Sequence, residues 1–329
     1  MSKAGAFILG TGRALPSRVL TNRDLEKMVD TSDEWITQRT GIKERRIVAE
    51  GESNSKLAIS ASRKALEKAG VAPEELDLII VATLTPDYPM PSVAILVQEA
   101  LGAHRAGAFD LSATCSGFLY ALSIADKFVR EDPARKILVI GSEVLSNKTN
   151  WEDRTTCVLF GDGAGAAVVT GSPDGRRGVL STHLHADGCL WHLLTLKGCG
   201  SLYPPCDPRI PREDYFIRMQ GREVFKNAVR AMESVAFEAL RANGLSPSDI
   251  ALLIPHQANI RIIEYLRERL ELPEERVFVN IHKYGNTSAA SIPIALDEAL
   301  EEGRLKEGDL VLMVSFGGGF TWAAVVLRW

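Results

Sequence analysis

One cysteine stands where a strand pattern changes into a helix pattern. The segment FDLSATCSGF begins as an apolar, strand-like run, and after Cys115 the apolar residues recur with a helical period from Phe118 to Phe128. At such a junction the unpaired amides and the helix dipole favour an anion, so we expect a lowered thiol pKa and a nucleophilic Cys115. The competing interpretation is an inert buried cysteine, the more common state of this residue type.

A histidine and an asparagine stand at two similar junctions. His256 directly follows the apolar run ALLIP, and the carboxyl end of a strand is where active sites of α/β proteins gather. Asn286, in YGNTSAASIP, opens a helix through small residues, which is also the position of an ordinary helix cap. A structural histidine is the alternative for His256. Together with Cys115, the two side chains would supply a nucleophile and hydrogen-bond donors for a developing oxyanion.

Two glycine-rich turns and a cysteine-rich stretch raise the question of three further sites, of which we expect one. SFGGGFTW places Gly318 in a turn whose amides could approach a substrate oxygen. FGDGAGA lacks the GxGxxG order and precedes an apolar run, so we expect no dinucleotide site. No two cysteines and no two histidines of the cysteine- and histidine-rich stretch have the spacing of a zinc knuckle, so we expect no metal there: Cys189, Cys199, Cys206, His183, His185 and His192.

The composition is that of an ordinary globular protein. The 329 residues include 38 basic and 42 acidic side chains and are 46% hydrophobic. This balance gives no global reason to bind nucleic acid or an anionic membrane. The apolar runs stop far short of the roughly 18 residues that span a bilayer, and the N-terminus lacks a signal pattern. We therefore expect a cytoplasmic protein without membrane insertion.

Short apolar runs alternate with segments of helical period, which indicates an α/β protein. The runs are LDLIIVAT, RKILVIGSE, IALLIPH and GDLVLMVSF. They are apolar on both faces, as expected for central strands that helices cover on each side.

An internal repeat predicts two homologous halves. ALEKAGVAPEELDLII aligns without a gap to ALRANGLSPSDIALLI, 174 residues later, and ILVI and VLMV keep the same offset. The offset matches His256 to Ala82 and brings Cys115 to position 289, close to Asn286. A pseudo-twofold would join these junctions in one cleft. We expect a first half over 1–171, a connecting loop region over 172–219 and a second half over 220–329.

Five motifs carry a resemblance to a known family: ATCSGF, PHQANIRI, YGNTSAASIP, SFGGGFTW and DEWITQRTGIKERRI. Together they resemble β-ketoacyl-[acyl carrier protein] synthase III over nearly the whole chain. The resemblance implies a thiolase-like fold of two duplicated halves in αβαβα layers, normally a homodimer. It also implies an acyltransferase that starts type II fatty acid synthesis from acyl-CoA and malonyl-acyl carrier protein, without a cofactor.

The resemblance also assigns roles to residues. Cys115 would take the acyl group, and His256 and Asn286 would stabilise the enolate formed as CO2 leaves. The amides of Cys115 and Gly318 would form the oxyanion hole. Met90 would cross the dimer interface to cap the partner's acyl pocket. The remaining CoA or substrate contacts would be Trp35, Arg39, Arg154, Asn259 and Phe316, and the carrier-protein contacts Gln257, Ala258, Asn259, Ile260, Arg261 and Lys226.

Three alternatives remain open on the sequence alone. A related thiolase-fold enzyme could use the same residues on other acyl-CoA substrates. A cysteine hydrolase would also need Cys, His and a polar residue, and would release free acid from acyl-CoA without a malonyl substrate. A non-catalytic binding protein is the third, and in it Cys115 would react with iodoacetamide no faster than the other cysteines. For the synthase, the resemblance implies acetyl-CoA or another short acyl-CoA as the primer.

Overall fold

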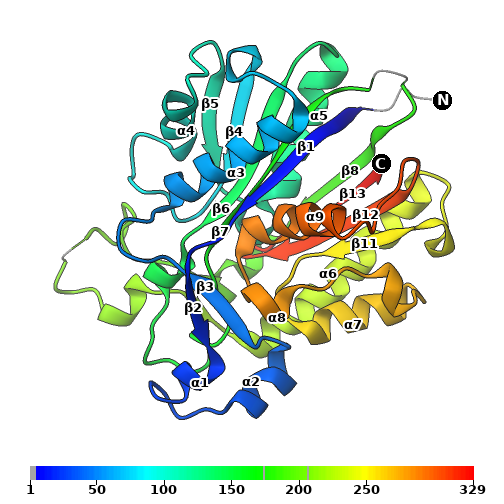
Figure 1. Cartoon of the computed structure of the whole chain (residues 1–329). Coiled ribbons are helices and arrows are strands. Elements are labelled where there is room, and N and C mark those ends of the chain that lie inside the picture. Colours follow the sequence, from blue (N-terminus) through cyan, green and yellow to red (C-terminus); the bar gives the residue numbers. More distant parts are fainter. Residues whose placement is uncertain (1–4, 173–174, 206) are drawn as a thin grey trace.

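The computed structural model describes residues 5–172, 175–205 and 207–329. Two mixed sheets form its centre, and helices lie between them and on their outer faces (Figure 1). The sheets come from the apolar runs found in the sequence, which are buried along their length.

The first sheet has the strand order β1-β7-β6-β4-β5, and the second has the order β11-β12-β13-β8. Two small pairs, β2 with β3 and β9 with β10, lie outside these sheets. The strands are β1 (Ala6–Ala14), β2 (Arg18–Thr21), β3 (Glu44–Ile47), β4 (Leu78–Ala82), β5 (Gly107–Leu111), β6 (Ile137–Glu143), β7 (Gly163–Gly171), β8 (Gly178–Ala186), β9 (Leu194–Thr195), β10 (Arg218–Met219), β11 (Leu252–Pro255), β12 (Leu310–Gly317) and β13 (Thr321–Arg328).

Helices complete the layers on both sides of each sheet. Helices α3 and α4 cover the outer face of the first sheet, α6 and α7 cover that of the second, and α5 and α9 lie between the sheets. The helices are α1 (Asn22–Leu25), α2 (Asp33–Thr40), α3 (Asn54–Ala69), α4 (Val93–Leu101), α5 (Gly117–Glu131), α6 (Gly221–Ala242), α7 (Ile260–Arg269), α8 (Ile281–Tyr284) and α9 (Ser291–Glu301). The order α-β-α-β-α confirms the predicted architecture.

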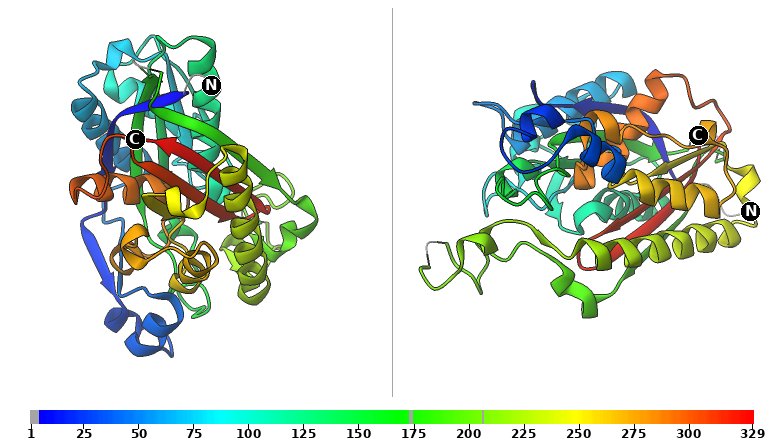
Figure 2. Two further views of the ribbon diagram at one scale, coloured as in Figure 1. Left: turned by 90° about the vertical axis from the view of Figure 1, so that its right-hand side faces the viewer. Right: turned by 90° about the horizontal axis from the view of Figure 1, so that it is seen from below.

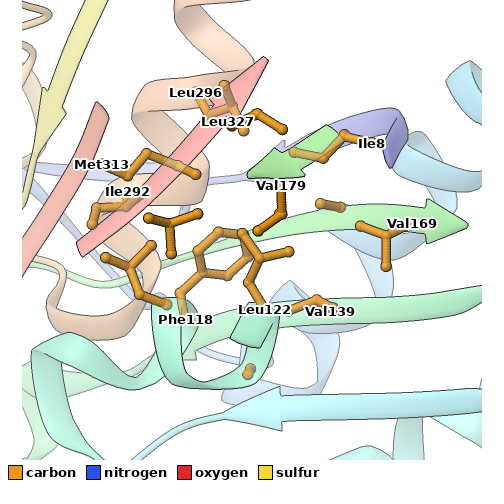
Figure 3. Close-up of a cluster of buried hydrophobic side chains, with 14 of the residues drawn as sticks. Ile8, Phe118, Leu122, Val139, Val169, Val179, Ile292, Leu296, Met313 and Leu327 are labelled. Carbon is orange, nitrogen blue, oxygen red and sulfur yellow. The ribbon is translucent and has the colours of Figure 1, made fainter. Parts of the chain in front are cut away.

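The central helix layer forms the largest apolar core. Figure 3 shows Phe118 and Leu122 of α5 among side chains of both sheets, with Ile292 and Leu296 of α9 close by. Burial of such side chains contributes about 1.5–3 kcal/mol each. Since this core draws on both halves of the chain, it fixes the position of one half against the other.

The predicted duplication appears in the strand register. Leu78 of β4 pairs with Ile137 of β6, and Leu252 of β11 pairs with Val311 of β12. Both positions differ by 174, the offset found in the sequence. The short 3-10 helices η2 (Thr114–Ser116) and η8 (Ser288–Ala290) keep the same offset.

The region over 172–219 differs from the expected connecting loop. Its first part is β8, which pairs with β13 at the edge of the second sheet, as β1 pairs with β7 at the edge of the first. The strand is GVLSTHLHA, and its polar residues hid it from a search for apolar runs. In the right-hand view of Figure 2, the segment between β9 and β10 extends away from the sheets.

None of the helices in the described part of the chain is both long enough and apolar enough to cross a membrane.

Candidate active site

Cys115, His256 and Asn286 line one cavity of about 110 Å³, together with Phe316 and Gly317. Cys115 belongs to η2 at the start of α5, His256 follows β11, and Asn286 precedes η8. An isolated bridge between Phe160 and Asn286 links segments from the two halves. The structure thus brings together the three residues that the sequence analysis selected.

The Cys115 thiol is less acidic than its place at a helix start led us to expect. Burial raises its pKa to about 12, and the charge of Glu143 acts in the same direction. The predicted lowering of this pKa is therefore wrong, because the loss of water around the sulfur outweighs the helix dipole. Cys115 is a thiol at neutral pH, and a nucleophilic reaction needs a base that accepts its proton.

His256 is buried and neutral. Burial lowers its pKa to about 3, so the imidazole carries no charge at neutral pH. Its Nδ1 lies 2.6 Å from the Ser291 hydroxyl, and its backbone N–H donates to the Val314 carbonyl. These contacts fix the ring and leave Nε2 for the cavity that His256 lines.

Asn286 is held by its backbone and its amide oxygen. Its N–H donates to the Leu159 carbonyl at 2.8 Å, and its carbonyl accepts from the Gly161 N–H at 3.0 Å. The Oδ1 atom accepts from the Ser288 N–H at 2.8 Å, which leaves the NH2 group as the donor for the cavity. A neutral imidazole and a neutral amide can together stabilise a negative oxygen.

The glycine turn after β12, a turn that begins at Gly317, lies directly against η2, the strand-to-helix elbow that carries Cys115. The Thr114 hydroxyl donates to the Gly318 carbonyl at 3.0 Å. A Cβ atom on Gly317 would come within 2.7 Å of the Cys115 nitrogen and 2.2 Å of Thr114 Oγ1. Glycine is therefore required at 317, since any side chain would separate the turn from the elbow.

A tryptophan of α2 stacks between two arginines, one on α2 and one in the segment between β6 and β7. The guanidinium groups of Arg39 and Arg154 each lie 5.6 Å from the ring centroid of Trp35. Asn259 connects this cluster to the cavity, because it lines the cavity and its amide donates to the Arg39 carbonyl at 3.0 Å. An aromatic face between two guanidinium groups suits a purine with phosphates.

The predicted carrier-protein residues fall into two groups. Lys226 is exposed and bonds Glu223 at 2.8 Å, and Arg261 stacks over Phe225 at 5.4 Å. Ala258 lines the cavity, and Ile260 packs in the cluster that contains Trp35.

The structure corrects the predicted role of Gln257 as a carrier-protein contact. Its side chain is buried, its amide donates to the carbonyls of Pro255 and Phe278, and its oxygen accepts from the N–H groups of Asn280 and Ile281. These internal bonds fix the loop after β11. The side chain is therefore not available to a protein partner.

A second cavity, of about 310 Å³, also borders Cys115. Its lining is mostly apolar and includes Leu84, Leu145, Phe160 and Ile217. Met90 does not line it within one chain and is 83% exposed.

Two of the histidines that were considered as metal ligands bind a carboxylate instead. His183 and His185 both bind the carboxylate of Glu238, at 3.0 and 2.7 Å. Among the residues that the structure describes, no group of three side chains could hold a metal ion. Cys206 lies outside the described residues.

Sequence reasoning missed Glu143 and Ser288. Glu143 ends β6 and is fully buried, and Ser288 follows Asn286 by two residues. The segment ILVIGSE held a signal for Glu143, a carboxylate that follows the apolar run ILVI after only a glycine and a serine.

The fold is the thiolase-like fold, and a thiol facing two neutral donors in one cleft is the equipment of a condensing enzyme of that class. Residues 109–188 match the family model described as 3-oxoacyl-[acyl-carrier-protein] synthase III, and residues 240–329 match the model of its C-terminal part. The chain belongs to the β-ketoacyl-[acyl-carrier-protein] synthase III family, a family of acyltransferases.

Similar proteins match over their full length. The β-ketoacyl-[acyl-carrier-protein] synthase III of Aquifex aeolicus is 57% identical over 99% of this chain and 100% of its own, and that of Caldanaerobacter subterraneus is 55% identical over 99% and 98%. The crystal structure of the Aquifex synthase matches with a TM-score of 0.92. The priming β-ketosynthase of the R1128 polyketide pathway is 38% identical over 99% of this chain and 97% of its own, with a TM-score of 0.92.

Proposed function

We propose that this chain condenses an acyl-CoA primer with malonyl-acyl carrier protein and so starts fatty acid synthesis. The main observation in support is that Cys115, His256 and Asn286 line one cavity. The Cys115 sulfur attacks the acyl-CoA carbonyl, the carbon–sulfur bond to CoA breaks, and CoA leaves. The amides of Cys115 and Gly318 stabilise the oxyanion of this step.

The second step uses the two neutral donors. Malonyl-carrier loses CO2, and His256 and Asn286 hydrogen-bond the enolate oxygen that results. Neutral donors suit this step, because a buried cation would stabilise the malonyl carboxylate as well as the enolate. The enolate carbon then attacks the acyl carbonyl on Cys115, which gives β-ketoacyl-carrier and frees the thiol.

Two surfaces support the binding of the partners in this reaction. The cluster of Trp35, Arg39 and Arg154 suits the adenine and phosphates of CoA, with Asn259 and Phe316 along the path to Cys115. Arg261 and Lys226, with Ala258 and Ile260 beside them, lie at the rim where an acidic carrier protein would dock.

A homodimer would complete the acyl site. The second cavity includes Leu84, and a surface groove from Leu84 to β5 contains the exposed Tyr88 and Phe109. A second copy that pairs along the β5 edge would cover this groove. Met90 of the partner would then close the cavity around the primer.

The test is intact-protein mass spectrometry after mixing with acetyl-CoA and longer or branched acyl-CoA. We expect a stable acyl adduct on the wild type and none on Cys115→Ser, and we expect the adduct to disappear when malonyl-carrier is added, with CO2 and β-ketoacyl-carrier as products. Loss of the adduct to water alone would mean a hydrolase. The absence of an adduct would overturn the proposal.

A further inference from the structure

The cavity has a feature that the reaction described above leaves unused. Glu143, a carboxylate at the end of β6, is 0% exposed, and its charge raises the pKa of the Cys115 thiol. β6 also passes directly against η8, because a Cβ atom on Gly141 would lie 2.2 Å from the Ala289 carbonyl oxygen.

Neutral donors hold this carboxylate in place. The Thr85 hydroxyl donates to it at 2.6 Å, the Leu84 N–H at 3.2 Å and the Thr83 hydroxyl at 3.3 Å. The Asn54 amide fixes Thr83 and Thr85 in turn, at 2.9 Å to the Thr83 hydroxyl and 2.7 Å to the Thr85 carbonyl. None of these partners carries a charge, so the carboxylate keeps its capacity to accept a proton.

Ser288 belongs to η8, which contacts both β6, the strand of Glu143, and η2, the segment of Cys115. Ala289 of η8 also packs against the start of α5, where a Cβ atom on Gly117 would lie 3.4 Å from the Ala289 Cβ. The Ser288 hydroxyl is buried, and no described group makes a well-directed hydrogen bond with it. Ser288 lowers the pKa of both Cys115 and Glu143. Its backbone φ of 48° is in the left-handed region, which a serine seldom adopts without a constraint.

We propose that Ser288 and Glu143 form a proton relay for Cys115. This inference rests on the proposed acyl transfer. As the Cys115 sulfur bonds the acyl carbon, its proton moves to the Ser288 oxygen while the Ser288 proton moves to Glu143. CoA leaves with the electron pair of the broken carbon–sulfur bond and takes a proton from water. When the enolate later displaces the Cys115 sulfur, Glu143 returns the proton along the same path.

The alternative base at this cleft is His256, which is much the weaker of the two. Burial lowers the pKa of His256 to about 3 but raises that of Glu143 to about 7. The carboxylate is therefore the better proton acceptor near neutral pH. Cys115 is a titratable group that interacts with Glu143, and the contacts from the loop after β4 and from η8 are uncharged.

The experiment measures the rate at which acetyl-CoA acylates Cys115, by rapid-quench mass spectrometry from pH 5.5 to 9. We expect the wild-type rate to rise with pH through a limb near 7, as Glu143 ionises. Glu143→Gln should lower the rate by about 10²-fold and abolish the limb, and Ser288→Ala should act in the same direction. Release of CO2 from malonyl-carrier by the already acylated variants should stay within about threefold of wild type.

Asp162→Asn is the matched control, because Asp162 is also a buried carboxylate bonded by a serine hydroxyl, that of Ser146, at 2.6 Å. It should retain the limb. If Glu143→Gln unfolds, Ser288→Ala decides, since it leaves the bonds from Thr85 and Leu84 to Glu143 in place. An unchanged limb in either folded variant would overturn the relay. If the wild type forms no adduct, the proposed function itself fails.

Discussion

At the ends of two matched strands, the first half of the chain has Ala82 and the second half has His256. At the two matched elbows, the first half has Cys115 and the second has Ala289, three residues after Asn286. The residues just before, Thr114 and Ser288, share a φ of 47° and 48°. The backbone is thus the same, while the reactive side chains are divided between the halves.

This division of the reactive side chains shows how one scaffold supports two chemical steps, acyl transfer and condensation. The first half supplies the thiol that carries the acyl group, and the second half supplies the neutral donors for the enolate. The shared left-handed φ at both elbows belongs to the scaffold, because it occurs with and without a nucleophile. Catalytic roles can therefore be tested by removing the difference between the halves, one position at a time.

The largest effect should come from His256→Ala, which gives the second half the residue of the first. We expect CO2 release from malonyl-carrier to fall about 10²–10³-fold, while acylation of Cys115 falls less than about 10-fold. Since the pKa of His256 is about 3, its donor is neutral at every pH above that value, and wild-type CO2 release should show no histidine limb between pH 5 and 8. The exposed His104→Ala is the control and should change neither rate.

An intermediate effect should follow when the ionic link between the halves is broken. Asp297 of α9 is buried and binds Thr11 and Arg13 of β1 and Lys68 of α3. Asp297→Asn should lower the free energy of unfolding by about 2–3 kcal/mol at pH 7, measured by urea denaturation.

The same carboxylate predicts a pH dependence of stability. Burial opposes ionisation of Asp297, but its bonds to Lys68, Thr11 and Arg13 prevail and lower its pKa. Its contribution is therefore present above the unfolded pKa of about 3.9 and is lost as the pH falls through the folded value. The half-exposed Glu301→Gln should cost under about 1 kcal/mol. Equal losses in both variants would contradict a buried link.

The smallest effect concerns a site outside the duplicated elements. Trp35 lies on α2, between β2 and β3, and stacks with Arg39 and Arg154. Trp35→Ala should raise the KM for acyl-CoA by about 10-fold and leave kcat for bound substrate nearly unchanged. Trp191→Ala, which removes a tryptophan that is 57% exposed, should leave KM as it is.

The sequence predicts most of the scaffold because its signals are local. The runs that form β4, β6, β11 and β12 are apolar on both faces, and the offset of 174 appears again in their register. The same offset predicted that Cys115 and Asn286 would meet. The sequence analysis did not predict β8, because a strand with Ser, Thr and His at half-buried positions resembles a loop.

The acidity of the site could not be read from the sequence. The helix start beside Cys115 is visible locally, but the burial that raises its pKa comes from segments far along the chain. Gln257 was assigned to the carrier-protein surface because the family resemblance includes the segment from Gln257 to Arg261, whereas the loop turns its side chain inward. Both errors concern solvent exposure, which depends on tertiary packing.

The most direct test of the divided chemistry measures both half-reactions in Asn286→Ala, with acylation of Cys115 followed by mass spectrometry and CO2 release followed in the acylated protein. We expect the acyl adduct to form at a rate within about 10-fold of wild type, while CO2 release falls at least about 10²-fold. An equal fall in both rates, or CO2 release that survives unchanged, would contradict the division of labour between the two halves.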